Sequence, residues 1–214
     1  TVISWNFKRA AGFMDVVAYT GNGTAGATQA HNLGVAPEFM IVKSRGSVRQ
    51  WVTYDSTNGA TGRMNLDDNG SWGAALQYWN NTAPTDSVFT LGTQYDVNQS
   101  SIAYIAYLFA SVAGVSKVGS YTGTGADLNV DCGFTAGARF ILIKRTDSTG
   151  DWYTYDSARG IVSGNDPYLL LNTTGAEVTN TDYIDPLASG FTVTSSAPAG
   201  LNANGGTYIF LAIA

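Results

Sequence analysis

The chain contains few of the residue types that build cross-links, metal centres and catalytic sites. Its 214 residues include one cysteine, one histidine and five prolines, and only 13% are charged. The single cysteine, Cys132, excludes an internal disulfide and is expected to be a small buried thiol. The single histidine, His31, excludes a multi-histidine zinc site. No stretch approaches the ~20 apolar residues that span a bilayer.

Positive charge is sparse as well. The eleven Lys and Arg residues are scattered along the chain, and the formal net charge is −5. Nucleic-acid binding depends on clustered basic residues, so we do not expect it here. Helix-forming residues never assemble into a 3.6-residue pattern, which leaves strands as the main element.

The most informative feature present is a pattern that occurs twice, about a hundred residues apart, which is the usual size of one domain. The recurring stretches are Tyr19–Gly23 with Tyr121–Gly125, Phe39–Lys43 with Phe140–Lys144, Trp51–Ser56 with Trp152–Ser157, and Ala103–Ala106 with Thr207–Phe210. This indicates a tandem duplication. Residues shared by both copies are expected to serve the fold, and residues found in one copy are candidates for function.

The duplication predicts the domain boundaries. Residues 14–110 form the first repeat and residues 111–214 the second. Residues 1–13 match the end of the first repeat, where Trp5-Asn6-Phe7 corresponds to Tyr107-Leu108-Phe109. We therefore expect 1–13 to be the terminal strand and linker of a preceding unit, and the chain to be a fragment of a longer modular protein.

The predicted fold class is all-β, with two tandem antiparallel β-sandwich domains of the same topology. Strands are expected at 16–20, 38–45, 50–55, 63–67, 87–91 and 101–110, with counterparts at 118–122, 139–145, 151–156, 168–172, 190–194 and 206–213. Two strands in each copy are apolar on both faces, for example Phe39–Val42. Such strands need cover on both faces. We expect the second cover to be the other copy or a neighbouring subunit.

No catalytic or metal site is predicted, and no cofactor. His31 is expected in a turn or at a strand edge. The run Asp67-Asp68-Asn69-Gly70 resembles the start of a calcium loop but lacks its bidentate glutamate, which favours a turn. A glycosidase needs two facing carboxylates. The candidates Glu38, Asp55, Asp67 and Asp86 show no distinguishable pair.

Aromatic residues give the candidate site. Trp51, Trp152, Tyr54 and Tyr155 occur in both copies and are expected in the cores. The ligand-binding candidates are specific to the first copy and lie in a Gly/Asn/Thr-rich segment: Trp72, Tyr78, Trp79 and Asn80. Flat aromatic rings beside amides can bind sugar rings. The alternative is that these rings fill a gap between domains or subunits.

Several motifs together resemble a repeat found in tail-fibre and other virion proteins of bacteriophages. They are Tyr19–Thr24, His31–Gly34, Pro37, Met40–Lys43 and Trp51, with Arg145–Trp152 in the second copy and the junction Ser4–Ala10. The second copy departs from the pattern where Thr135 replaces Gly34 and Ala138 replaces Pro37. The resemblance implies a virion or extracellular location, host attachment and a homo-oligomer, often a trimer.

On this basis we expect a non-catalytic virion appendage fragment that binds a host-surface glycan or surface protein. Two other functions stay open. A polysaccharide depolymerase would place two carboxylates in a groove beside Trp72 or Trp79. A purely structural module of a fibre, head decoration or filament would extend its first thirteen residues toward a neighbour's sheet.

Overall fold

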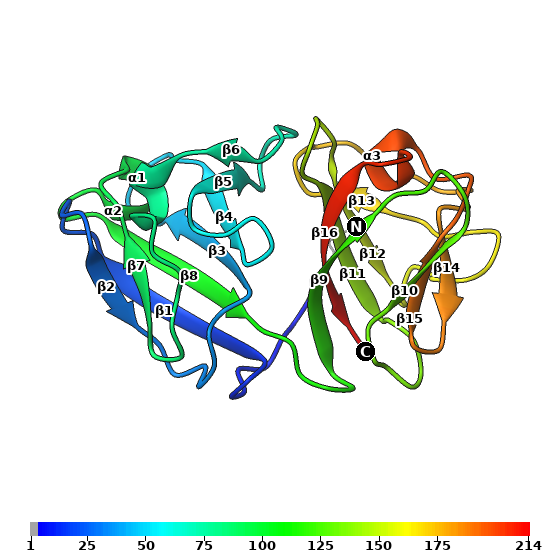
Figure 1. Cartoon of the computed structure of the whole chain (residues 1–214), viewed down its shortest axis with the longest axis horizontal. Coiled ribbons are helices and arrows are strands. Elements are labelled where there is room, and N and C mark those ends of the chain that lie inside the picture. Colours follow the sequence, from blue (N-terminus) through cyan, green and yellow to red (C-terminus); the bar gives the residue numbers. More distant parts are fainter. Residues whose placement is uncertain (1–3) are drawn as a thin grey trace.

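The computed structural model describes residues 4–214 and consists of two similar β-rich halves that lie side by side (Figure 1). The only helices in this range are three of four residues each, and none is long and apolar enough to cross a membrane. The predicted all-β class with antiparallel sheets is confirmed.

The first half runs from β1 to β8. Its elements are β1 (Met14–Thr20), β2 (Ala27–Ala30), β3 (Phe39–Ser44), β4 (Trp51–Asp55), β5 (Gly62–Asn65), β6 (Gly73–Ala74), α1 (Leu76–Trp79), β7 (Val88–Leu91), α2 (Tyr95–Asn98) and β8 (Ala103–Phe109). The second half runs from β9 to β16. Its elements are β9 (Ser116–Thr122), β10 (Leu128–Asp131), β11 (Phe140–Arg145), β12 (Trp152–Asp156), β13 (Leu169–Leu170), β14 (Ile184–Leu187), β15 (Gly190–Val193), α3 (Ala199–Asn202) and β16 (Thr207–Ile213).

The strands that the two halves share have the same order, and each half adds one edge strand, β6 in the first and β14 in the second. The large sheet is β1-β8-β3-β4-β5-β6 in the first half and β9-β16-β11-β12-β13 in the second. The small sheet is β2-β7 in the first half and β10-β15-β14 in the second. β2 pairs antiparallel with β7, with Ala27 opposite Leu91, and β10 pairs in the same way with β15, with Leu128 opposite Val193. The shared topology confirms the predicted pair of like sandwiches.

All twelve strands expected from the sequence are present, with ends that differ by a few residues. The sequence analysis missed four strands, β2, β6, β10 and β14. β2 and β10 are each four residues long and half exposed. β2 shows no apolar alternation, and β10 alternates Leu128 and Val130 with polar residues over only four positions. The pairing with β7 or β15 makes them strands, and a single-sequence pattern does not contain that partner.

The central strands of each large sheet send alternate side chains into two different cores. In β3, Met40 and Val42 face the core of the first half, while Phe39 and Ile41 face the other way. In β11, Ile141 and Ile143 face the core of the second half. The outward-facing residues of the two large sheets meet in a third apolar cluster, whose buried members are Met14, Phe39, Met64, Phe109, Val118, Phe140, Leu142, Trp152, Ile209 and Leu211.

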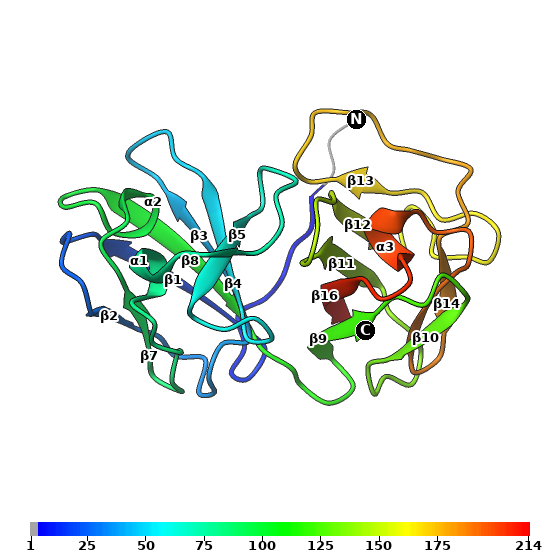
Figure 2. The same ribbon diagram turned by 45° about the horizontal axis from the view of Figure 1, so that its top comes forward.

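The molecule is therefore layered as small sheet, large sheet, large sheet, small sheet. The view in Figure 2 shows the two large sheets on either side of the central seam. The second cover predicted for the two-faced strands is thus the other copy within the same chain. Neither Phe39 nor Leu142 is more than 4% exposed. These strands need no neighbouring subunit to leave water.

The segment before β1 lies between the halves rather than extending away (Figures 1 and 2). Phe7 contacts Phe109 of the first half and Phe140 of the second, with ring centroids 6.1 and 5.4 Å apart. The expectation of a strand at 1–13 is wrong for residues 4–9, which have no regular structure, because their aromatic side chains pack into the seam instead of joining a sheet edge. Residues 1–3 lie outside the described range.

A buried polar node recurs in both halves and explains the repeated Tyr-Thr-Gly motif. Tyr19 stacks on Tyr104, and Tyr121 stacks on Tyr208, with centroids 5.2 and 4.8 Å apart. Gly21 lies against the carbonyl of Gln99, at a distance where any Cβ would collide. The equivalent Gly123 meets the carbonyl of Ala203 in the same way. Only glycine fits at these two places.

An asparagine completes each node, and the sequence analysis did not identify it. The Asn98 amide donates to the carbonyls of Thr24 (3.0 Å) and Gly92 (2.7 Å), and its oxygen accepts from Asn22 N (2.9 Å). Asn202 makes the equivalent contacts in the second half. Both side chains are buried.

We predict that Asn98→Ala and Asn202→Ala each destabilise the protein by about 2–4 kcal/mol, because each substitution leaves several buried main-chain groups without hydrogen-bond partners. Urea unfolding followed by tryptophan fluorescence measures this. The control is Asn204→Ala, at an exposed position. A loss below about 0.5 kcal/mol in both node variants would contradict the assigned role.

Candidate functional site

The aromatic residues predicted to bind a ligand are mostly used in packing. Trp79 and Tyr78 lie in α1 and belong to the first core, with 1% and 5% of their surface exposed. The Trp79 ring packs edge-on against Tyr54 at 5.9 Å. Asn80 is exposed and ends α1 in a left-handed conformation. The sugar platform expected on Tyr78 and Trp79 is not formed, because a buried ring has no free face to stack on.

Trp72 lies at the seam between the halves, in agreement with the alternative that it fills a gap between domains. Its ring packs against the seam cluster, and its main-chain N–H donates to the carbonyl of Thr146 in the second half (2.9 Å). It belongs to the segment Leu66–Trp72, called here the docking loop. The predicted turn at Asp67–Gly70 forms within this loop, where Asp68 accepts from Gly70 N (2.8 Å).

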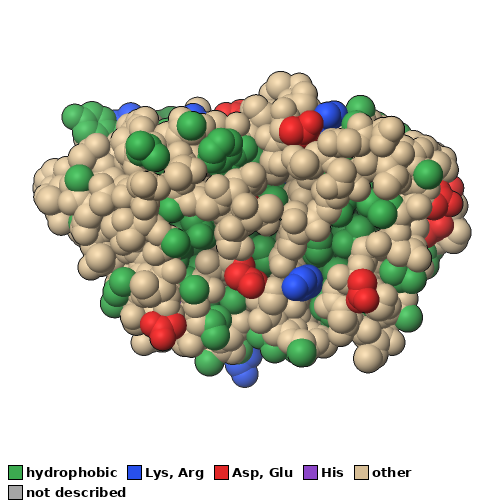
Figure 3. All heavy atoms as spheres, in the orientation of Figure 1, with side chains coloured by type: hydrophobic (Ala, Val, Ile, Leu, Met, Phe, Trp, Pro, Cys, Tyr) green, Lys and Arg blue, Asp and Glu red, His purple; other side chains and the backbone are tan. Residues whose placement is uncertain are grey.

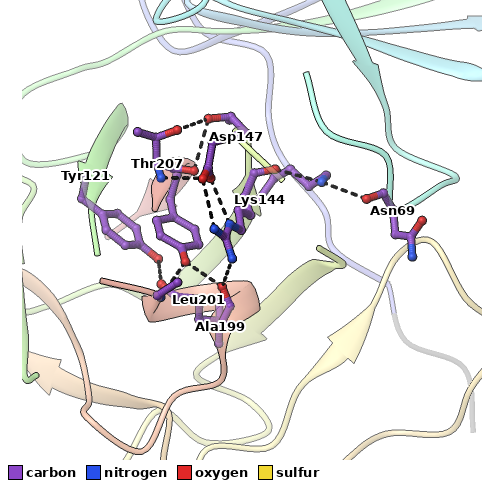
Figure 4. Close-up of polar contacts among 11 residues, drawn as sticks. Asn69, Tyr121, Lys144, Asp147, Ala199, Leu201 and Thr207 are labelled. Atoms are coloured by element: carbon purple, nitrogen blue, oxygen red, sulfur yellow. Dashed lines mark hydrogen bonds and ion pairs between the residues drawn. The ribbon is translucent and has the colours of Figure 1, made fainter. Parts of the chain in front are cut away.

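The docking loop covers one edge of the second half, which we call the Trp152 edge (Lys144, Trp152 and the hairpin 146–151). The Asn69 carbonyl accepts from Gly150 N (3.0 Å) and Lys144 Nζ (3.4 Å). Figure 4 shows Lys144 pointing toward Asn69 across the seam. The Trp152 indole donates to the carbonyl of Asn65, just before the loop (2.8 Å). Both Lys144 and Trp152 are fully buried.

Burial has a clear electrostatic effect on this lysine. Desolvation lowers the pKa of Lys144 to about 8, although the nearby carboxylates of Asp68 and Asp151 act in the opposite direction. Its Nζ donates to the carbonyl of Arg145 as well (2.9 Å). The ammonium group serves the contact between halves and has no route to a substrate.

The equivalent edge of the first half is open, and here the sequence prediction is wrong. Trp51 was expected in a core, yet 37% of its surface is exposed, against 1% for Trp152. Lys43 lies 5.4 Å from its ring centroid, as Lys144 lies 6.0 Å from that of Trp152. The residues and their local pairing are the same, but the first copy has no loop over them.

Three of the four candidate catalytic residues are held in structural contacts. Asp55 is buried and accepts two hydrogen bonds from Asn58, both 2.8 Å long. Glu38 accepts from Ser111 N and Oγ, at 2.7 and 2.5 Å. Asp67 accepts from the main-chain N–H of Trp51 (3.1 Å). The fourth candidate, Asp86, is exposed.

His31 and Cys132 behave as predicted. His31 follows β2, is buried, and accepts from Leu33 N through Nδ1 (3.3 Å). Cys132 is buried, and desolvation raises the pKa of its thiol to about 12, so the thiol stays protonated and unreactive at neutral pH. Among residues 4–214 no group of His, Cys, Asp or Glu is arranged to hold a metal ion.

Asp166 has the most strongly shifted carboxyl group, and its partners are structural. Desolvation raises its pKa to about 7 against the opposing effect of two amide donors, Tyr183 N (2.9 Å) and Ile184 N (3.0 Å). Both oxygens thus hold the start of β14. The side chain is fully buried, which removes it from consideration as a general acid.

A hollow lies where the N-terminal segment crosses the second half. It has a volume of about 400 Å³ and is lined by residues that include Trp5, Asn6, Arg139, Asp156, Ser157 and Arg159; we call it the Trp5 hollow. Trp5 is half-buried and also lines a neighbouring hollow of about 570 Å³ beside β13. Its indole donates to Asp156 Oδ2 (2.9 Å), which fixes the ring.

Two arginines of the Trp5 hollow are specific to the second copy. Arg159 stands where the first copy has Asn58, and Arg139 stands where it has Glu38. The Arg159 guanidinium pairs with Asp156 (2.7 Å) and lies 5.4 Å from the Trp5 ring centroid. Arg139 is exposed at the rim. An aromatic ring, hydroxyl groups, an amide and a free guanidinium therefore meet in one place.

A family model described as a domain of unknown function (DUF7483) matches residues 1–214. The chain belongs to this family. Comparisons with curated proteins and with solved structures returned no match. The family model spans both halves, as expected if the pair joined through the seam is the unit that members of the family share.

We predict that the stability of this family member rises as the pH increases from about 8 toward the ordinary pKa of lysine, 10.5. In this window Lys144 is deprotonated in the folded protein and protonated in the unfolded chain, so the unfolded state binds more protons. Below about pH 8 the effect is absent. Thermal midpoints at pH 7 to 9.5 measure it, and Lys144→Met should remove the rise. An equal rise in both proteins would contradict the assignment.

Proposed function

We propose that this protein is a non-catalytic module of a bacteriophage virion appendage, such as a tail fibre, that attaches to a host-surface glycan through the Trp5 hollow. The observation that carries the proposal is the convergence of Trp5, Asn6 and Arg139 around the Trp5 hollow. The resemblance of the repeat to virion proteins supplies the setting, which is virion or extracellular.

The chemistry of the hollow favours an acidic glycan. An indole offers an apolar face to the C–H groups of a sugar ring, and an amide or hydroxyl bonds its hydroxyl groups. Arg139 adds a cation that can pair with a sugar carboxylate in a bidentate contact. The face shown in Figure 3 carries few charged side chains, of both signs, on a mostly uncharged surface.

The seam supports the use of the protein as an appendage. Three aromatic rings of the N-terminal segment and the first half, Phe7, Phe13 and Phe109, contact one another at 6.1 to 6.5 Å across this region. The two halves and the segment are packed into one body, which suits a part that transmits force between virion and host. A homo-oligomer, with a trimer favoured, belongs to the same proposal.

The two other functions differ in how they fit. The depolymerase requires paired carboxylates beside Trp72 or Trp79; Trp79 is buried, Trp72 lies at the seam, and neither lines a hollow described above. The structural module required residues 1–13 to extend away, whereas Trp5 and Phe7 pack on their own chain. A structural role that uses other surfaces remains the second candidate.

We predict that the protein binds acidic glycans on an array and that Trp5→Ala weakens binding about tenfold or more, because the central aromatic contact is lost. Arg139→Gln should weaken binding to acidic glycans about threefold to tenfold and leave neutral glycans unaffected. Matched controls are Leu76→Ala and Lys8→Gln, at exposed positions outside the hollow.

The Arg139→Gln variant guards against misfolding as an explanation, because its side chain is exposed and makes no ion pair with a described residue. Thermal midpoints check both variants. Glycan binding that is unchanged in Trp5→Ala and Arg139→Gln would remove the Trp5 hollow as the site. Binding to no glycan, together with a role in assembly, would favour the structural module.

A further inference from the structure

The duplication gives the seam two equivalent edges, and only one of them is covered by a loop. By the duplication, the Trp152 edge corresponds to a Trp51 edge, which consists of Lys43, Trp51 and the hairpin 45–50. Asn65 and the docking loop make four hydrogen bonds with the Trp152 edge: the carbonyls of Asn65 and Asn69 accept three, and the main-chain N–H of Trp72 donates one. The Trp51 edge receives nothing comparable.

The second half has its own version of the docking loop. Leu66 N donates to the carbonyl of Trp51, and Leu171 N donates to that of Trp152, so the loops begin in register. They end in register too, because Gly73 pairs with Arg63 and Val178 with Tyr168. Residues 66–72 therefore correspond one to one with residues 171–177.

The two loops also share their internal turn. Gly70 N donates to the side chain of Asp68 (2.8 Å), and Gly175 N donates to that of Thr173 (3.3 Å). Loop 171–177 thus carries the same backbone device as the docking loop. Its residues 173–177 are all exposed, whereas the docking loop is held against the second half.

The Trp51 edge is exposed and has hydrogen-bond donors, unpaired within the described residues, to which such a loop could bind. Trp51 is 37% exposed and Val48 99%. The Trp51 indole N–H and the Arg49 main-chain N–H, which correspond to the bonded donors of Trp152 and Gly150, make no hydrogen bond with residues 4–214. A hollow of about 250 Å³, lined by Trp51, Leu66, Asp67 and Leu171, lies at the same place.

The loop of the same chain does not fill this edge. Only its first residue, Leu171, reaches Trp51, and residues 173–177 instead flank the hollow beside Trp5. We infer that the Trp51 edge binds loop 171–177 of a second copy of this chain, repeating between molecules the contact that the docking loop makes within one. This inference does not depend on glycan binding at the Trp5 hollow.

Charge complementarity supports loop 171–177 as the occupant. In the sealed contact Trp72 N bonds the carbonyl of Thr146. The corresponding residues in the open contact are Glu177, on the loop, and Arg45, on the hairpin. The substitutions thus bring an exposed carboxylate to an exposed guanidinium at this position. Between chains, such a pair favours the correct register and raises the association rate.

The contact joins two different surfaces of the same chain. It closes either as a reciprocal pair, in which each molecule offers its loop to the other, or as a ring. In both cases every Trp51 edge is filled. A reciprocal pair makes the contact twice, which strengthens association beyond that of a single loop.

The test is sedimentation velocity on the full chain from about 1 to 500 µM, where a standard interface would show. We expect a dimer or trimer at the upper end. Arg45→Glu and Glu177→Arg should each weaken association about threefold to tenfold, and the double variant should restore it, because only the pair is complementary. Trp51→Ala should weaken association at least tenfold. Lys8→Gln is the control.

The indole N–H resonance of Trp51 in ¹⁵N spectra gives a second measurement on folded protein, and it should shift with concentration. A monomer over the whole concentration range overturns the inference. This holds whether the Trp51 edge is open in the monomer or is covered by the loop of the same chain. The inference is also overturned if neither charge reversal weakens self-association, or if the double variant does not restore it. Glycan binding is measured separately, so the Trp5 hollow and the loop contact can each fail alone, whereas a monomer also counts against the proposed homo-oligomer.

Discussion

Burial of the outer faces of the two large sheets against each other is the contact on which the rest of this structure depends. Each large sheet has a small sheet on one side only, so Phe39, Phe109, Phe140 and Leu142 would otherwise face water. Facing one another, they form a third core that neither half could complete alone. The repeats are therefore two copies in sequence but one unit in packing, which is consistent with a family model that spans both.

The same contact explains why identical motifs acquire different environments. A lysine and a tryptophan on adjacent strands occur in each copy, yet Trp152 is covered and Trp51 is not. The difference originates in loops of equal length and similar turns, one of which crosses the seam while the other lies beside Trp5. The N-terminal segment enters the seam once and has no counterpart on the other side, so the duplicated unit is held asymmetrically.

Much of the fold could be predicted from the sequence because strand alternation and turn residues are local signals. The two-faced strand Phe39–Val42 even indicated that a second cover was needed.

The candidate site could not be predicted in this way. Comparing the copies correctly marked Trp72 as specific to the first, but specificity to one copy indicates a special environment, and at Trp72 that environment is the seam. The prediction that Trp51 lies in a core was wrong for the converse reason. Its recurrence in both copies does not indicate which of the two edges a loop covers. Arg139 and Arg159 also differ between the copies, and that signal could have drawn attention to the Trp5 hollow.

A duplicated domain that packs against itself has a specific consequence for binding surfaces. Two equal units related by an approximate rotation present every contact twice, and each contact that one unit makes has a counterpart that must be filled, capped or exposed. Here the Trp152 edge is filled and the Trp51 edge is exposed, while a corner with Glu38 and Asn58 in one copy carries Arg139 and Arg159 in the other. Because the shared cores fix the backbone, substitution at such corners changes surface chemistry at little cost to the fold. Function in this chain is therefore best sought where the two halves stop being equivalent.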